Sequence, residues 1–485
     1  MELLQADFGN VANSLVAVGD EDGGIRLLET KIDEKPEFSV PYLGFRPHTN
    51  AVLDLSFSPD DMLLATASGD QTAKIIDMPT QKSICTMAGH VSSIKAISFQ
   101  PGSCNVLATS SRDGSVQIWD LRCGGMNPPV REIKMPLEPV EAPLSSAQKM
   151  TWARPVNMIL EAHSLRQSNP TKTTANWDVP LKRETPARNT DVSVTALSFL
   201  NPGREHLLLT ASEANASIKL WDLRTNYTSR RSRPTPLSST RPPDSHGRYR
   251  QFGLNSICLS GDAAKLYALC RDNTVYAYST SHLVLGHAPE LSSTTTPTKP
   301  RRYTPGAEKQ GLGPLYGFRH PSFHATTFYV KCVVRPATET HTELLAVGSG
   351  DSTPILFPTD ERYMRSSAVE QNRPVVAQHP ASTKGPQRPN AGPRTTSRAS
   401  GGRLKDTIAI YQHGTALVGG HRTEVTSLSF SKGGELISVG DDFDVRCWRE
   451  GDRAKELRNC GEAGGKRWGC GWAEATQGWD DDDSD

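Results

Sequence analysis

Short stretches of alternating apolar and polar residues recur along the chain and predict β-strands. Residues 51–57 (AVLDLSF) alternate in this way, and a second apolar stretch over 63–68 follows Ser-Pro-Asp-Asp, a typical turn sequence. Five further segments, two of them weaker, repeat the order of strand, turn and strand: 94–99 with 106–111, 194–199 with 207–212, 425–430 with 436–439, 257–259 with 266–270, and 328–334 with 344–348. Because strands this short cannot bury a core alone, the pattern predicts several small sheets packed against one another.

A third short strand closes each repeat with a large apolar or aromatic residue. The closing residues are Leu28, Ile76, Trp119, Trp221, Tyr278, Phe357 and Trp448. An aspartate, or an asparagine in one repeat, precedes each of them at the same short spacing: Asp22, Asp70, Asp113, Asn215, Asp272, Asp351 and Asp442. Seven such units predict an all-β fold, a seven-bladed WD40 β-propeller with long disordered inserts between and within its blades.

Three of the units also carry a histidine upstream of the aspartate. The pairs are His48 with Asp70, His90 with Asp113, and His421 with Asp442. We predict a structural network in each of these blades, in which the aspartate accepts a hydrogen bond from the imidazole and the other ring nitrogen reaches a strand Ser or Thr. A catalytic His–Asp pair is the alternative, but the recurrence of the pair at blade spacing favours the structural role.

Four segments rich in Pro, Ser and Thr interrupt the repeats, at about 123–190, 226–252, 280–325 and 358–418. We expect these inserts to be mostly disordered. The propeller is expected to span 1–457, and 458–485 to form a short C-terminal segment with an acidic tail.

The closure of the ring has two alternative explanations. In the first, residues 1–8 form the inner strand of the first blade and 466–473 closes the last blade. In the second, the sequence lacks its true N-terminus, because few residues precede the stretch at 15–19 that already looks like a second strand. We favour the second explanation slightly.

The overall charge is close to neutral, with 54 Lys and Arg against 53 Asp and Glu, so charge alone indicates no nucleic-acid partner. The last three inserts are basic, however, which provides either solubility or a weak, salt-sensitive contact with DNA or with an acidic surface of a partner. The nine cysteines contain no CxxC pair and are expected to be reduced thiols of an intracellular protein. No apolar run approaches the roughly 18 residues needed to cross a bilayer, and no membrane partner is expected.

Catalytic motifs are absent from the sequence. It contains no phosphate loop, no nucleophile elbow, no HExxH and no zinc-spaced Cys/His cluster. We therefore expect no catalytic residues, no metal and no cofactor, and a protein that is not an enzyme.

The sequence Trp-Asp-Leu-Arg occurs twice, at 119–122 and 221–224. The Trp-Asp pair is typical of the end of a propeller strand, but a blade has no structural need for the arginine. Two neighbouring repeats that both carry it indicate a surface for a partner. The two copies resemble the box by which WD40 receptors dock on the triple-propeller adaptor of cullin-4 RING ubiquitin ligases. This resemblance implies that the adaptor-binding residues are Arg122, Arg224, Trp119, Asp120, Trp221 and Asp222.

Further motifs resemble the denticleless family of substrate receptors. They are GDQTAK at 69–74, RDG at 112–114, NYT at 226–228 and TFYVK at 327–331. The resemblance implies a substrate-recognition subunit of a cullin-4 RING E3 ligase in the nucleus. Its substrates would be cell-cycle and replication-licensing proteins whose degrons lie on the sliding clamp on DNA. Animal members carry a clamp-binding box in a long tail, and this sequence has none, so direct clamp contact by the chain is in doubt.

Under this resemblance the substrate would bind the narrower face of the propeller, opposite the docking arginines. By their place in the repeat, the candidate substrate-binding residues are Asn50, Ser93, Arg112, Asn255, Arg271, Tyr329, Glu424 and Asp441. The two acids would receive basic degron residues. The alternative function is a chromatin-associated or assembly scaffold without a ligase role, which loss of adaptor binding on removal of both arginines would distinguish.

Overall fold

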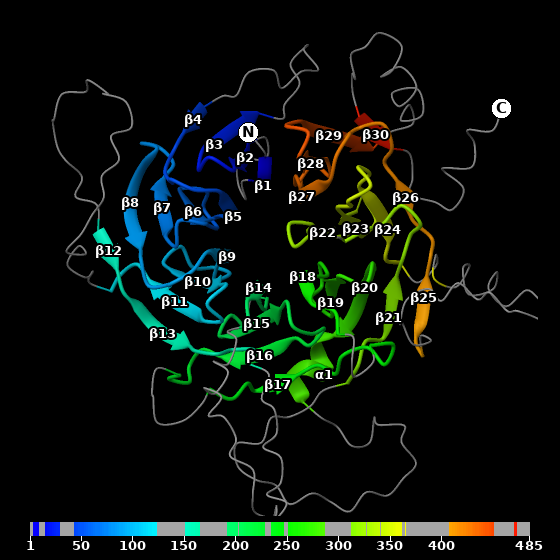
Figure 1. Cartoon of the computed structure of the whole chain (residues 1–485), viewed down its shortest axis with the longest axis horizontal. Helices are drawn as coiled ribbons and strands as arrows, with labels where there is room; N and C mark the ends of the chain where they lie inside the picture. The colour runs from blue at the N-terminus through cyan, green and yellow to red at the C-terminus, as the bar shows by residue number, and fades with distance from the viewer. Residues whose placement is uncertain are drawn as a thin grey trace, which may run out of the picture.

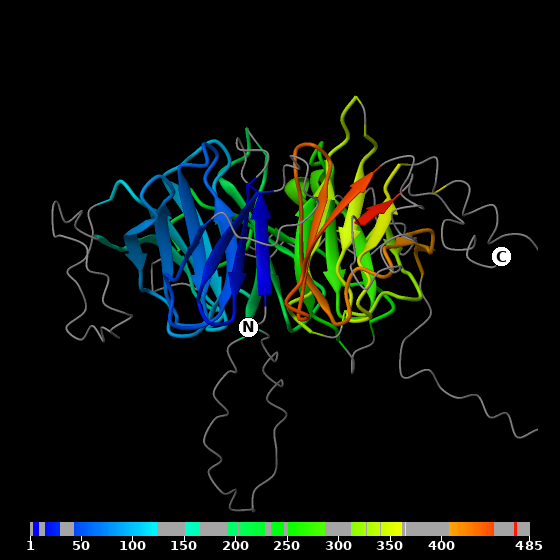
Figure 2. The same ribbon diagram turned by 90° about the horizontal axis from the view of Figure 1, so that it is seen from above.

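The computed structural model describes residues 3–8, 15–29, 43–123, 151–164, 192–201, 203–227, 234–246, 251–286, 312–325, 327–339, 341–360, 364, 407–450 and 470–472. These residues form seven antiparallel-based sheets arranged as blades around a central axis (Figure 1). The predicted seven-bladed, all-β propeller is confirmed. The ring is a flat disc when seen from its edge (Figure 2).

The first three blades use the following strands. Blade 1 contains β1 (Leu3–Phe8), β2 (Leu15–Asp20), β3 (Ile25–Glu29) and β4 (Leu43–Phe45). Blade 2 contains β5 (Val52–Phe57), β6 (Leu63–Ser68), β7 (Ala73–Asp77), β8 (Lys82–Met87) and β12 (Thr151–Ala153). Blade 3 contains β9 (Ile94–Phe99), β10 (Val106–Ser111), β11 (Val116–Asp120) and β13 (Pro155–Ile159).

In the other four blades, as in the first three, the strands are named from the centre of the ring outward. Blade 4 contains β14 (Val194–Phe199), β15 (Leu207–Ser212), β16 (Lys219–Asp222) and β17 (Ser238–Ser239). Blade 5 contains β18 (Leu254–Leu259), β19 (Lys265–Cys270), β20 (Thr274–Ser279), β21 (Tyr316–Phe318) and β25 (Ala409–Tyr411), with helix α1 (Thr280–Leu285) after β20. Blade 6 contains β22 (Cys332–Arg335), β23 (Leu344–Val347), β24 (Ile355–Pro358) and β26 (Thr415–Ala416). Blade 7 contains β27 (Val425–Phe430), β28 (Leu436–Gly440), β29 (Val445–Glu450) and β30 (Cys470–Trp472).

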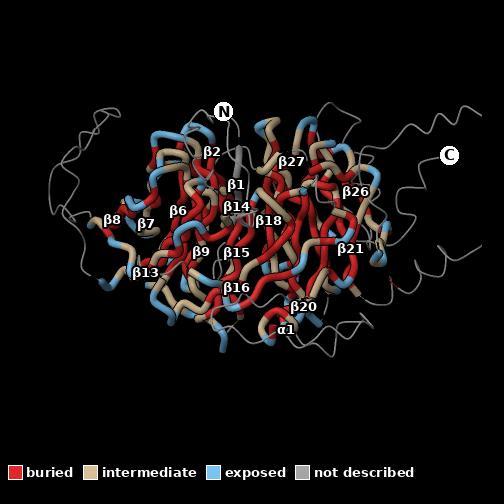
Figure 3. Tube along the Cα trace, turned by 60° about the horizontal axis from the view of Figure 1, so that its bottom comes forward, coloured by how far each residue is buried: buried red, intermediate tan, exposed pale blue. Residues whose placement is uncertain are grey.

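The hydrophobic core lies between the blades, as the buried segments of Figure 3 show. The core between blades 2 and 3, for example, joins Ile75 of β7 to Ile97 of β9 and to Trp119 of β11. Trp119 and Trp221 are fully buried. Each such aromatic side chain removes about 150–250 Å² from water, so the two tryptophans bury much apolar surface where blades 2, 3 and 4 meet.

The predicted insert boundaries were too wide, because every insert contributes secondary structure. Strands β12 and β13 lie within 123–190, β17 within 226–252, α1 and β21 within 280–325, and β25 and β26 within 358–418. These outer strands have two to five residues and carry no alternating pattern, so their sequence gives little signal. The rest of each insert lies outside the described residues.

Two of these segments connect neighbouring blades in the same way. Strand β12 adds to the outer edge of blade 2 in parallel with β8, and the chain then becomes β13, the outer strand of blade 3. Strand β25 likewise adds to blade 5 in parallel with β21, and β26 becomes the outer strand of blade 6. Each segment therefore hydrogen-bonds two blades together at the rim.

The structure contains both strands that the first of the two arrangements predicts. Strand β1 pairs with β2 as the inner strand of blade 1 and contacts both β27 and β5, the inner strands of its neighbours. Strand β30, within 466–473, pairs in parallel with β29 and completes blade 7. No helix of the described part is long and apolar enough to cross a membrane.

The histidines of blades 2, 3 and 7 lie in hydrogen-bonded chains with the same geometry. In blade 3, His90 Nδ1 lies 3.1 Å from Asp113 Oδ2, and His90 Nε2 lies 2.8 Å from Thr109 Oγ1. The indole Nε1–H of Trp119 donates to the same Thr109 oxygen at 2.8 Å. Since this hydroxyl accepts from Trp119, it can donate its own proton to Nε2, which leaves the imidazole proton on Nδ1 for the aspartate.

The matching contacts in the other two blades repeat this arrangement. His48 lies 2.9 Å from Asp70 and 2.7 Å from Thr66, and His421 lies 3.0 Å from Asp442 and 2.6 Å from Ser438. These are the contacts that the sequence spacing predicts. Burial alone would raise the pKa of the Asp113 carboxyl, but hydrogen bonds from His90 and Ser115 outweigh it and hold that pKa well below its usual range.

Two further network histidines, His163 and His246, were missed because they lie in segments assigned to disordered inserts. His163 Nε2 lies 2.9 Å from Thr210 Oγ1, which also accepts from Trp221 Nε1–H at 2.9 Å. Burial, with a smaller contribution from the charge of Lys219, lowers the pKa of His163 to about 3.

In blade 5, His246 Nε2 lies 2.9 Å from Asp272 Oδ2, and the hydroxyl of Tyr276 donates to the same oxygen at 2.6 Å. The thiol of Cys270 lies in this group as well, and its sulfur and the ligand atoms of His246 and Asp272 are within 4.8 Å of one another. Blade 5 thus keeps the His–Asp pair, but the Tyr276 hydroxyl takes part in its hydrogen-bonded network where blade 3 uses a tryptophan and a threonine.

Replacing Asp113 with alanine should destabilise the propeller by about 1–3 kcal/mol, because the buried His90 and Ser115 groups then lose their acceptor. The matched control is Asn215→Ala in blade 4, where the described hydrogen bonds to the side chain come from Ser217 alone. Thermal unfolding should show the larger loss for Asp113→Ala. Equal midpoints for wild type and Asp113→Ala would contradict the structural role of the network.

The His163 pKa predicts a pH dependence of stability. Because the folded pKa lies below the unfolded value of 6.5, the unfolded chain binds a proton first, and this histidine makes stability fall as the pH drops below about 6.5. The slope for one proton is about 1.4 kcal/mol per pH unit. Unfolding of wild type and His163→Gln between pH 7.5 and pH 5 should show a shallower slope for the variant, and identical slopes would refute the assignment.

Candidate functional site

The first Trp-Asp-Leu-Arg copy forms a turn at the end of β11. Trp119 is fully buried, Leu121 packs against the core between blades 2 and 3, and the Arg122 side chain is 66% exposed. Asp120 accepts hydrogen bonds from Arg122 Nε at 2.9 Å and from Nη2 at 2.7 Å. Its Oδ1 also accepts from the Arg122 backbone N–H. The turn therefore buries Trp119 and half-buries Leu121, while the Asp120 carboxylate holds the exposed Arg122 side chain.

The second copy repeats this geometry at the end of β16. Leu223 packs against the core between blades 3 and 4, and the Arg224 side chain is 68% exposed. Asp222 accepts from Arg224 Nε at 2.9 Å and from Nη2 at 2.7 Å. Strands β11 and β16 are the third strands of adjacent blades and run in the same direction, so both turns lie on one face of the ring (Figure 1).

The two ion pairs leave each arginine able to bind a partner. The hydrogen bond from Arg122 lowers the pKa of Asp120, and that from Arg224 lowers the pKa of Asp222, so both pairs are charged at neutral pH. Each guanidinium has five N–H groups, of which its aspartate takes two. Three N–H groups per arginine remain to donate to carboxylates or carbonyls of a docking protein.

A residue that the sequence analysis missed, Asn157 of β13, holds the second turn. Its Nδ2 donates to the backbone oxygens of Leu223 at 3.3 Å and Thr225 at 2.7 Å, and its Oδ1 accepts from the Tyr227 N–H at 3.0 Å. The Tyr227 ring in turn meets Trp221 edge-on, with ring centroids 5.5 Å apart. Asn157 escaped detection because it lies in a segment assigned to a disordered insert.

The candidate substrate-binding residues come from five blades, and local contacts join some of them. The Arg112 N–H donates to Ser93 O in blade 3, and the Asp441 N–H donates to Glu424 O in blade 7. Asn50 is exposed in blade 2, where its side chain accepts from the Ala51 N–H. Arg271 of blade 5 donates its backbone N–H to Gly253 O and is partly buried.

The segment 327–331 draws three of these blades together. Asn255 Nδ2 of blade 5 donates to Thr327 O at 2.6 Å, and Thr327 Oγ1 donates to Glu424 Oε1 of blade 7 at 2.9 Å. Asn255 is only 1% exposed. It therefore fits a role in positioning this segment better than the predicted direct contact with substrate. Glu424, one of the two predicted acidic receivers, shares its carboxylate with Thr327.

Phe328 and Lys331 of this segment, and the neighbouring Lys95, were not among the predicted site residues. Lys95 Nζ of blade 3 lies 3.7 Å from the centroid of the Phe328 ring of blade 6, so Phe328 reaches a blade three places away. Burial, then repulsion from Lys331 and Arg112, lowers the pKa of Lys95 to about 8. The pattern gave a signal for Lys95, which is the second residue of its inner strand, where other inner strands carry Leu53, Thr195 or Thr426.

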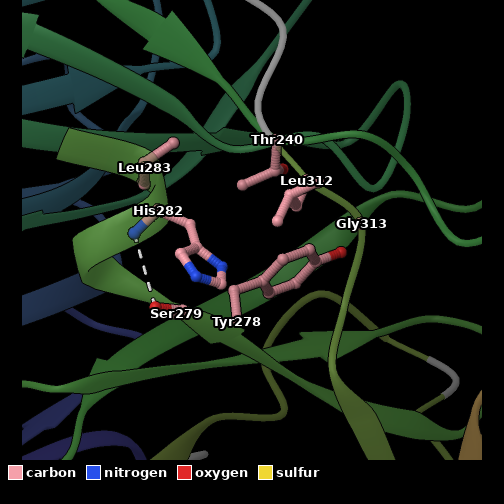
Figure 4. Close-up of a pocket in the computed structure, with 7 residues that line it drawn as sticks. All are labelled: Thr240, Tyr278, Ser279, His282, Leu283, Leu312 and Gly313. Atoms are coloured by element: carbon pink, nitrogen blue, oxygen red, sulfur yellow. Dashed lines mark hydrogen bonds between the residues drawn. The ribbon is translucent and has the colours of Figure 1, made fainter. Parts of the chain in front are cut away.

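A small cavity lies away from both faces, between α1 and its neighbours (Figure 4). It is lined by Thr240, Tyr278, Ser279, His282, Leu283, Leu312 and Gly313. Its volume of about 10 Å³ holds roughly one water molecule, which is too little for an organic ligand.

Comparison with known proteins agrees with the repeat pattern. The family model described as WD domain, G-beta repeat matches residues 39–77, 81–120 and 414–449. The cell division cycle protein cdt2 of Schizosaccharomyces pombe is 27% identical over 446 residues, which cover 90% of this chain and 66% of that protein.

Animal relatives match over a shorter stretch. The denticleless protein homolog of Homo sapiens is 31% identical over 276 residues, covering 56% of this chain and 33% of the relative. The homolog of Xenopus tropicalis is 30% identical over 270 residues, covering 56% of this chain and 34% of the relative. The matches thus span about a third of the animal proteins and just under two thirds of the yeast protein. The chain belongs to the denticleless (cdt2) family of WD40 proteins.

Proposed function

We propose that this chain is the substrate-recognition subunit of a cullin-4 RING E3 ubiquitin ligase. In this role it docks on the triple-propeller adaptor through Arg122 and Arg224, and Trp119, Asp120, Trp221 and Asp222 shape the two turns. The observation that carries the proposal is the pair of exposed, carboxylate-held arginines on adjacent blades of one face. The chain itself performs no ubiquitin chemistry and acts in the nucleus.

The opposite face is the proposed substrate surface. It offers basic, aromatic and acidic groups at the channel mouth, including Lys95, Phe328 and Glu424. Such a mixed surface suits a peptide degron, and by family resemblance the substrates are cell-cycle and replication-licensing proteins bound to the sliding clamp on DNA. Weak DNA contact through the basic inserts is part of the same proposal and concerns residues outside those described.

In this proposal the two surfaces lie on opposite faces of the propeller. The arginine turns end the third strands, whereas residues such as Ser93 and Arg112 lie where the inner strands begin. A substrate bound at one face is then presented at a fixed distance and direction from an adaptor bound at the other. Positioning of this kind supplies proximity, which is the contribution of a receptor to a reaction that other subunits catalyse.

The Arg122→Ala/Arg224→Ala double variant should lose adaptor binding, because both sets of free N–H donors disappear while the buried Trp residues remain. Each single change should weaken the affinity for purified adaptor by roughly tenfold, as truncation of a central interface arginine does. Biolayer interferometry with the purified adaptor gives the dissociation constants, and thermal unfolding checks the fold.

The matched control is Arg46→Ala, an exposed arginine of blade 1 that donates to Asp22 O. It should bind the adaptor as wild type does. If folded wild-type chain failed to bind the adaptor at all, the receptor function would be wrong and the chromatin or assembly scaffold would replace it.

A further inference from the structure

The outer strand of blade 3 and the arginine turn of blade 4 form one hydrogen-bonded unit through Asn157. We propose that Asn157 is a positioning residue for docking: it fixes the Arg224 turn relative to the Arg122 turn, so that the two arginines present one rigid surface. The partner that fits this surface carries two groups of carboxylate or carbonyl acceptors at a matching separation. This inference rests on the proposed function.

The second turn needs an external support because the chain leaves the sheet at Asp222. Beyond that point, two backbone–backbone hydrogen bonds are described for Leu223, Thr225 and Tyr227. The Leu223 N–H donates to His206 O, and the Thr225 N–H donates to Asp222 O. The Asn157 amide supplies two donors and one acceptor to this stretch. A single side chain thus fixes three successive points of the segment that carries Arg224.

Asn157 is itself rigidly held. It is 8% exposed, and Ile118 of β11 is its partner in the strand ladder. Its Oδ1 also accepts from the Met158 N–H at 2.9 Å. Ile118 precedes Asp120 by two residues, so a continuous path of covalent and hydrogen bonds leads from Arg122 through β11 and β13 to Arg224.

Such a path matters for binding because two donor groups must meet two acceptor groups at once. If the second turn moved freely against the first, association would have to freeze that motion, and affinity would fall even though both arginines were present. Both turns share two other anchors, a backbone bond from the leucine N–H (Leu121 to Asn105 O, Leu223 to His206 O) and a buried tryptophan, so the bonds from Asn157 are an additional support of the second turn. Asn157 should therefore affect the contribution of Arg224 and leave that of Arg122 unchanged.

The experiment is a double-mutant cycle on the full chain, with binding to the purified adaptor as the readout. Asn157→Ala should weaken binding about three- to tenfold. Combined with Arg224→Ala it should add little further loss, because the turn no longer carries its arginine. Combined with Arg122→Ala it should add its full loss. Amide hydrogen exchange of residues 225–227 should be faster in Asn157→Ala than in wild type.

Two further variants make the outcome decisive. Asn157→Asp has nearly the same size and keeps the acceptor for Tyr227 but places a carboxylate against two carbonyl oxygens, so it should weaken binding in the same way even if the alanine variant folds poorly. Val156→Ala is the control: this neighbour on β13 is 46% exposed and, because side chains alternate along a strand, points to the other face of the sheet. It should bind as wild type does.

The results separate the two proposals. If Arg224→Ala weakens binding but Asn157→Ala and Asn157→Asp bind the adaptor as wild type does, the positioning role is overturned and the proposed function stands. Losses for Asn157→Ala that add fully to those of Arg224→Ala would also overturn it, because independent action excludes positioning. Absence of wild-type binding would remove the proposed function and this inference with it.

Discussion

Apolar packing between neighbouring sheets is the interaction on which the structure depends. A strand of four to six residues exposes two faces, and each blade can bury both only against the blades beside it. The core is accordingly divided into clusters that each span two blades, such as the one that unites Leu107 and Trp119 of blade 3 with Ile75 of blade 2. In blades 2 to 5 and in blade 7, hydrogen bonds between buried His, Asp, Thr, Ser, Trp or Tyr side chains then fix the geometry of the blade, because they satisfy polar groups that this packing buries.

The sequence predicts the inner strands and turns that the packing between blades requires, but it predicts poorly the outer strands, which that packing does not require. The inner three strands of each blade carry a buried pattern and a large apolar or aromatic closing residue, so the number of blades and the Trp-Asp turns could be predicted from residues such as Trp119 and Trp221. The outer strands β13, β17 and β26 make few apolar contacts and have no such pattern. His163, His246 and Asn157 lie in or beside outer strands, within segments that were assigned to inserts, and the partners of His163 and Asn157 are also far away along the chain, which is why sequence spacing did not identify them.

The candidate substrate face shows the same limit. Asn50, Ser93 and Arg112 were placed by their position in the repeat, which the regular blade geometry supports. The bridging of blades 5 and 7 by Thr327, and the contact of Phe328 with Lys95 across the channel, depend on one irregular segment that precedes β22. No repeat pattern encodes such a segment, because its conformation is set by the three blades it touches.

The way the ring closes has a mechanical consequence. Among the described residues, all four strands of blade 1 come from 3–45 and all four of blade 7 from 425–472, so these two blades share no described strand. Chain segments cross at the rim from blade 2 to blade 3 and from blade 5 to blade 6. The boundary between blades 7 and 1 is thus a seam held by side-chain packing, with Val16 and Val18 against Ile437 and Val439. Local opening should start at this seam. Blade 4 lies diametrically opposite, so the arginine turns occupy the part of the ring that such opening would disturb last.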